Sequence, residues 1–137
     1  LTYVDPETLV ITGTTTVEFN ALSLAYNEER DAYVAGTRGT FDFFLLDGNL
    51  KITDYCEAVQ TKSVKQEVEV YQDKILFGMS GDNILYVYDW EGNFLYAIDL
   101  ELYEEFENLI FHGDYAYTGY FSGGGIIYET IFYQELD

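Results

Sequence analysis

The chain has 137 residues, 48% of them hydrophobic and only one of them proline, a composition that suits one folded domain and argues against disorder. With 25 acidic and 6 basic residues the formal net charge is −19, so repulsion excludes nucleic acid and anionic membranes as partners. No apolar run approaches the ~20 residues that span a bilayer, and the single cysteine excludes a disulfide framework.

Two sequence markers recur along the chain. One is an aspartate that ends an apolar strand and precedes a short polar turn, and the other is a glycine that ends an apolar strand. The markers are Asp5, Asp47 and Asp89 for the first, spaced by 42 residues, and Gly36, Gly78 and Gly119 for the second, spaced by 42 and 41. Because two independent markers share one period, the sequence predicts a structural repeat.

A period of about 42 residues that holds four antiparallel strands is typical of a β-propeller blade. The expected strands, in chain order, are 3–5, 9–11, 22–26, 32–36, 41–46, 50–55, 68–71, 75–78, 84–88, 94–100, 109–111, 115–120 and 126–133. They divide one partial propeller domain, residues 1–137, into units at 1–18, 19–62, 63–104 and 105–137. The first unit supplies the third and fourth strands of a blade, and the last lacks its outer strand. No helix is expected.

Side-chain patterns agree with that order of strands. Consecutive apolar residues at Phe43–Leu46 and Ile75–Phe77 predict inner strands that are covered on both faces. Leu50–Asp54 alternates, which predicts an outer strand with one packed face and one wet face. A chain that enters and leaves in mid-blade would carry unpaired edges, so we expect roughly half of a six-bladed ring, with a separate or linked N-terminal half as its partner.

The stretch Tyr86–Phe94, Tyr-Val-Tyr-Asp-Trp-Glu-Gly-Asn-Phe, resembles the NHL-like and related bacterial six-bladed propellers, whose blades carry a hydrophobic-Asp-x-x-Gly-x-hydrophobic turn. Asp47–Leu50 matches with a shorter turn, and Asp5–Leu9 matches in outline. WD40 repeats fit less well because no Gly-His and Trp-Asp pair lies in register, and kelch repeats would need a Gly-Gly pair in each blade. The likeness rests on a structural turn, so it implies a fold and no activity.

In such propellers the ligand face is built by the loops that join the fourth strand to the next blade and the second strand to the third. The resemblance therefore implies ligand-binding candidates in these loops, and they are Asn20, Arg38, Glu67, Asp82, Asn83 and Asn108. Arg38 could hold a ligand carboxylate with two hydrogen bonds, or pair with an acidic neighbour.

Acidic residues of the same loops are candidate metal ligands. Glu67, Asp82 and Asn83, with Glu105 and Glu107, could supply the oxygen ligands that Ca²⁺ takes, or could be solvated charges. The metal is therefore unknown, and no cofactor is expected unless Ca²⁺ binds here.

Catalysis has no specific support in the sequence. His112 is the only histidine, so a multi-histidine metal site is excluded within this chain, and a turn role is favoured over a general base. Cys56 has no histidine near it in sequence, which argues against a nucleophile. The tyrosine-rich strands are either a platform for sugar stacking or packing between blades.

The sequence thus predicts an all-β, non-catalytic propeller module that binds a ligand or protein, or serves as a scaffold. The rival interpretation is a Ca²⁺-dependent lyase or hydrolase with its site on the axial loop face, and a third is a glycan-binding adhesion module. Expected partners are the rest of the propeller and a protein or glycan ligand, without nucleic acid or membrane insertion. The resemblance and the lone cysteine favour an exported bacterial protein, extracellular or in the cell envelope.

Overall fold

The structure, a computed structural model, describes residues 1–37, 42–57, 66–79, 84–99, 106–112, 115–120 and 125–129. These residues form thirteen β-strands and contain no helix. The strands are β1 (Thr2–Val4), β2 (Ile11–Thr14), β3 (Ala21–Asn27), β4 (Ala32–Thr37), β5 (Asp42–Asp47), β6 (Ile52–Glu57), β7 (Gln66–Tyr71), β8 (Lys74–Met79), β9 (Ile84–Tyr88), β10 (Phe94–Asp99), β11 (Phe106–His112), β12 (Tyr115–Tyr120) and β13 (Gly125–Glu129). No apolar helix of membrane-spanning length is found in this part of the chain.

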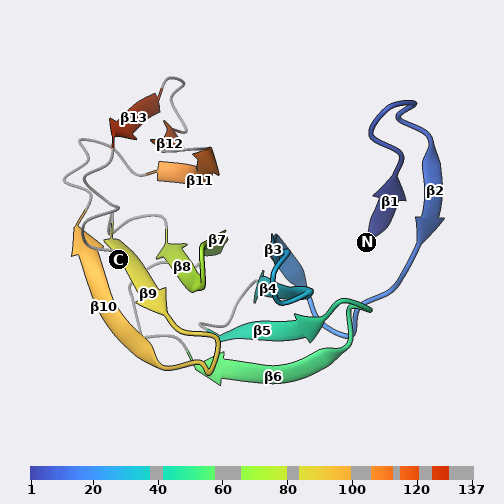
Figure 1. Ribbon diagram of the computed structural model, residues 1–137, viewed down its shortest axis with the longest axis horizontal. Coiled ribbons are helices and arrows are strands. Elements are labelled where there is room, and N and C mark those ends of the chain that lie inside the picture. Colours follow the sequence, from blue (N-terminus) through green and yellow to red (C-terminus); the bar gives the residue numbers. More distant parts are fainter. Residues whose placement is uncertain are drawn as a thin grey trace.

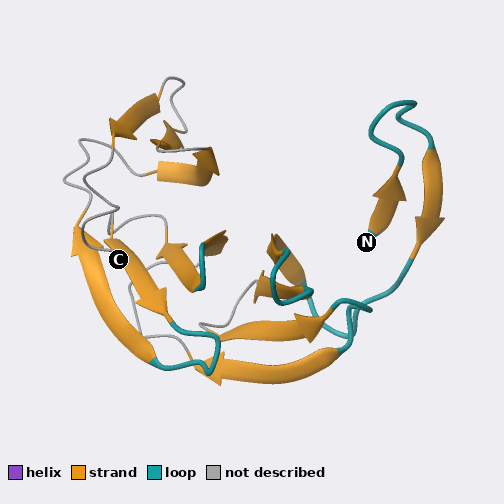
Figure 2. Cartoon of the chain, in the orientation of Figure 1, coloured by secondary structure: helices purple, strands orange, loops and turns teal. Residues whose placement is uncertain are grey.

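The strands form four antiparallel sheets, in each of which every strand pairs with the next one along the chain. We call them the first (β1–β2), second (β3–β6), third (β7–β10) and fourth (β11–β13) sheets. They follow one another around an open arc, with β3, β7 and β11 on its inner side and β6 and β10 on its outer side (Figures 1 and 2). The inner strand β7 contacts both β3 and β11.

The expected strands are found, and the all-β class with four-stranded antiparallel sheets is confirmed. β9 and β12 have the predicted bounds, and the other strands overlap their predicted ranges with ends shifted by a few residues. The last expected strand, 126–133, is found as β13, and its part beyond Glu129 lies outside the described residues.

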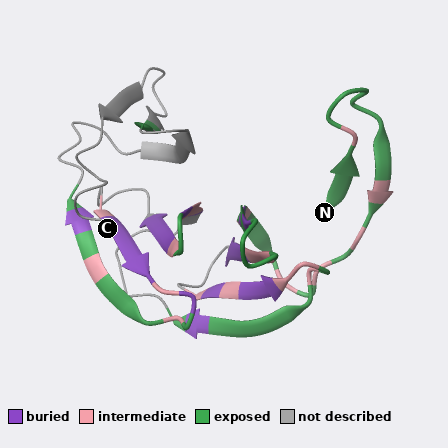
Figure 3. Cartoon of the chain, viewed as in Figure 1, coloured by how far each residue is buried: buried purple, intermediate pink, exposed green. Residues whose placement is uncertain are grey.

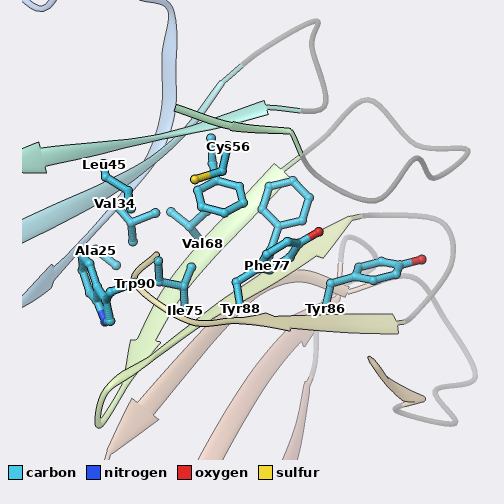
Figure 4. Close-up of a cluster of buried hydrophobic side chains, with 11 residues drawn as sticks. Ala25, Val34, Leu45, Cys56, Val68, Ile75, Phe77, Tyr86, Tyr88 and Trp90 are labelled. Atoms are coloured by element: carbon cyan, nitrogen blue, oxygen red, sulfur yellow. The ribbon is translucent and has the colours of Figure 1, made fainter. Parts of the chain in front are cut away.

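The main core lies between the second and third sheets. Phe43 of β5 meets Tyr88 and Phe77 with ring centroids 5.0 and 5.7 Å apart, and Phe77 and Tyr88 lie 6.4 Å from each other in an edge contact. Figure 4 shows Phe77, Tyr88 and Cys56 within this cluster. Aromatic rings at these separations add to the stability that comes from burying their surface.

The prediction that the inner strands are covered on both faces is confirmed for β8, where Ile75, Leu76 and Phe77 are all fully buried (Figure 3). Ile75 and Phe77 belong to the cluster between the second and third sheets, while Leu76 points to the opposite face.

The prediction of an outer strand with one wet face is confirmed for β6, which lies at the edge of its sheet. The alternation does not carry over to burial, however, because the apolar Ile52 is exposed and only Cys56 of β6 is buried. A β-bulge explains the difference, because Leu45 pairs with Asp54 while Leu46 pairs with Ile52, leaving Thr53 as the extra residue. Ile52 therefore lies on the face opposite the main core.

Candidate functional site

The structure brings two of the predicted ligand residues to equivalent places on the inner strands. Glu67 of β7 pairs with Gly78, and Asn108 of β11 pairs with Gly119. The same register on β3 pairs Ser23 with Gly36. Ser23, Glu67 and Asn108 therefore form an equivalent set on the inner strands of three successive sheets, which we call the inner set.

Sequence analysis missed Ser23 as a member of this set. Each member of the set pairs with one of the glycines that mark the repeat, so the sequence does indicate where the set lies. The strand register is needed to tell which residue is opposite each glycine. Asn20, the residue predicted instead in the second sheet, lies just before β3 with an exposed side chain.

The other predicted ligand residues, Arg38, Asp82 and Asn83, lie outside the described residues, as does Glu105. Glu107 lies in β11 beside Asn108. Among the residues that the structure does describe, no group of three or more acidic, histidine or cysteine side chains could hold a metal ion.

Two side-chain hydrogen bonds hold the inner strands β3 and β7 together. The Val68 N–H donates to Ser23 Oγ at 3.2 Å, and Asn27 Nδ2 donates to the Gln72 carbonyl at 3.0 Å. Asn27 is buried and its Oδ1 also accepts from the Arg30 N–H at 3.0 Å. Because a buried amide without partners is costly, these bonds fix the alignment of the two strands beside the inner set.

The repeated aspartates build closely similar turns. The Leu50 N–H donates to the Asp47 carbonyl at 2.9 Å, and the Gly92 N–H donates to the Asp89 carbonyl at 3.2 Å. Leu50 and Gly92 also share a left-handed backbone, with φ of 63° and 83°. The two turns therefore have equal length, and the prediction that the Asp47 turn is the shorter one is wrong.

The carboxylates of these aspartates serve the turns. Oδ1 of Asp89 accepts the N–H groups of Glu91 and Asn93 at 3.0 and 2.8 Å, and its Oδ2 accepts from Asn93 Nδ2 at 2.9 Å. Partial burial raises the pKa of Asp89, but the hydrogen bonds from Asn93 and Glu91 outweigh it and hold the pKa below its ordinary value. Two backbone N–H groups, of Thr8 and Glu7, likewise lower the pKa of Asp5.

The one thiol is also structural. Burial raises the pKa of Cys56 to about 11, with a smaller contribution from the carboxylates of Asp54 and Asp89. The thiol is therefore protonated at neutral pH, and a protonated thiol is a poor nucleophile.

A pocket of about 440 Å³ lies between the segment that joins the first sheet to the second and the turn between β5 and β6. It is lined by Thr15, Thr16, Val17, Glu18, Phe19, Asn49, Leu50, Lys51 and Ile52. The Phe19 ring is fixed by stacking on Phe44 with centroids 4.6 Å apart. Hydroxyl, amide and charged groups beside an aromatic ring suit a small polar ligand.

None of the predicted ligand residues lines this pocket, although Asn20 follows Phe19 directly. Its two walls are about thirty residues apart in sequence, and only the path of the chain brings them together.

Comparison with known proteins adds no identification, because no family model matches the chain and no curated protein matches it significantly.

Proposed function

We propose that the chain is part of a six-bladed, NHL-like β-propeller that acts as a non-catalytic binding or scaffold module. The observation that carries the proposal is the equivalent register of Ser23, Glu67 and Asn108 on the inner strands of three successive sheets. Radial blades put their first strands around a common axis, and residues in one register then line one end of it.

The non-catalytic interpretation is supported by the described carboxylates and the described thiol, which have structural roles. The carboxylates of Asp5, Asp47 and Asp89 accept backbone hydrogen bonds of their own turns, and Cys56 is a protonated thiol. A net charge of −19 favours a neutral or cationic ligand, such as a glycan or a basic protein surface. We further propose that the protein is exported by a bacterium and that the rest of the ring is its obligatory partner.

The ring is tested by electron microscopy of the natural polypeptide that contains this chain. Class averages with six radial blades are expected, and two sheets packed face to face would end the proposal.

The binding face is tested on an array of neutral glycans with the double variant Glu67→Gln/Asn108→Ala. We expect the variant to lose at least about tenfold in affinity, which corresponds to about 1.4 kcal/mol. Glu29→Gln is the matched control, because Glu29 is exposed in the turn beyond the other end of β3. Equal losses in both would show that only net charge matters.

Ca²⁺ titration separates the proposal from a metal-dependent enzyme. The thermal midpoint of the chain should be the same in Ca²⁺ and in chelator, and a midpoint several degrees higher in Ca²⁺ would favour the Ca²⁺-dependent lyase or hydrolase instead.

A further inference from the structure

The first sheet exposes apolar residues whose equivalents in the next two sheets are buried. Leu1, Tyr3 and Val4 are 39–49% exposed. The residues 42 and 84 positions later are at most 6% exposed, and they are Phe43, Leu45 and Leu46 in the second sheet and Leu85, Val87 and Tyr88 in the third. One sequence pattern thus has two burial outcomes, so the cause is a missing neighbour and not the local sequence.

The missing neighbour on one side is a strand. The equivalents of β1 are β5 and β9, and each of these pairs with the strand before it, β4 or β8, as well as the strand after it. Among the described strands β1 pairs only with β2. The free edge of β1 faces the inner side of the arc, since β2 lies on the outer side of β1 (Figure 1). Unpaired backbone N–H and C=O groups on such an edge are a template for another strand.

A second exposed apolar surface lies on the second sheet. On the face of the second sheet away from the main core, Leu24 and Tyr26 of β3 are 40% and 45% exposed. Their equivalents on β7 are Val68, which is 5% exposed, and Val70, which is half-buried, and both contribute to the cluster between the second and third sheets. The second sheet covers that face of the third. On the matching face of the second sheet Phe19 stacks on Phe44, but this contact leaves Leu24 and Tyr26 exposed (Figure 3).

We infer that the free edge of β1 and the exposed face of the second sheet around Leu24 and Tyr26 form one docking surface. Its occupant is an antiparallel β-hairpin from the remaining segment of the propeller, with apolar residues toward the second sheet and no net negative charge. One hairpin strand pairs with β1, as β4 pairs with β5, and the hairpin covers the second sheet as the second covers the third. The shape of the occupant rests on the proposed propeller.

The occupant is expected to be a hairpin by analogy with the interface between the second and third sheets. In both complete sheets the two inner strands are a hairpin, β3–β4 or β7–β8. The hairpin of the third sheet hydrogen-bonds across to Ser23 and Asn27 of the second, through Val68 of β7 and Gln72 of the turn that follows it. The charge of the occupant follows from the net charge of −19, which would repel an acidic segment.

The probe is a synthetic peptide with the sequence of residues 21–37, the hairpin of the second sheet, carrying Glu28→Lys and Glu29→Lys so that it is cationic. It is added to the full 137-residue chain, and backbone hydrogen exchange is followed by NMR. We expect exchange at Thr2–Val4 to slow at least about tenfold at saturation and exchange in β8 to stay unchanged.

Matched controls isolate strand pairing. The same peptide with Val34→Pro lacks a central N–H and should give no protection of β1. In the chain, Tyr3→Glu changes an exposed side chain, so the fold is retained while peptide affinity falls. The peptide without its lysines should bind more weakly, and the difference should shrink in high salt.

No protection of β1 at about 1 mM peptide would overturn the inference. Protection that appears without peptide and grows with chain concentration would also overturn it, because the occupant would then be a second copy. A ring seen by microscopy without protection of β1 would reject the docking surface alone, whereas protection without a ring would reject the propeller alone.

Discussion

Replacing Gly92 by alanine should destabilise the protein by about 2–4 kcal/mol, although the change adds one methyl group in an external turn. Gly92 has a φ of 83°, which side chains other than glycine adopt with difficulty. A Cβ built at this position would also run into the Sγ of Cys56, a buried side chain of the neighbouring sheet.

The magnitude is centred on the mid-range values of three contributions, which together give about 2.8 kcal/mol. The left-handed backbone costs about 1–2 kcal/mol once a Cβ is present. Overpacking against a buried side chain costs about 1–3 kcal/mol. Reduced freedom of the unfolded chain returns about 0.4–1 kcal/mol. At roughly 3 °C per kcal/mol for a domain of this size, the thermal midpoint should fall by about 6–12 °C.

Urea unfolding, followed through the fluorescence of the single tryptophan, measures the loss, and a double-mutant cycle divides it. Cys56→Ala should remove the clash, so Gly92→Ala should cost about 1–3 kcal/mol less in that background. The control is Gly48→Ala, because Gly48 has no positive φ and the atoms nearest to its Cβ would be those of the Asp31 carboxylate, an exposed side chain and not a buried one.

Additivity of Gly92→Ala and Cys56→Ala within about 0.5 kcal/mol would refute the packing argument. A Gly92→Ala cost no larger than that of Gly48→Ala would refute the backbone argument as well.

Leu9 is exposed and has a φ of 57°, so Leu9→Asn should stabilise the protein by about 0.5–1 kcal/mol, whereas the β-branched Leu9→Val should not. Calorimetry measures the thermal midpoints of both variants, and equal midpoints would contradict this prediction. Asn27→Ala should cost about 1–3 kcal/mol in urea unfolding because it leaves the Gln72 carbonyl without its donor, whereas exposed Asn49→Ala should stay within about 0.5 kcal/mol. The Cys56 pKa of about 11 exceeds the ordinary 9.0, so its stabilising contribution is complete below pH 9 and is lost as the pH rises through 11. Alkylation of the folded thiol at pH 8 should accordingly be at least about tenfold slower than in urea, and equal rates would show that it is accessible.

Much of the candidate site could not be read from the sequence. Glu67 and Asn108 were predicted from their loops, and the structure places them in strands, at equivalent registers with Ser23. The repeat glycine Gly36 marks the place of Ser23, but only the strand register shows that Ser23 is the residue opposite it. The pocket beside Phe19 was missed for a similar reason, since its walls come from separate segments.

The sequence by itself determined where the strands lie and that they pair in antiparallel order. Alternation, turn aspartates and strand-ending glycines act on residues close along the chain, and such local preferences need no knowledge of what packs across them. Tertiary structure decided which turns are equivalent and which apolar faces are covered. Leu50 takes the left-handed place that Gly92 takes in the next sheet, because hydrogen bonding to the turn aspartate, and not residue type, sets that conformation. Tyr3 and Val87 are 84 residues apart and occupy the same position of the repeat. Tyr3 is exposed and Val87 is buried, because burial depends on the neighbouring strands that only the folded chain supplies.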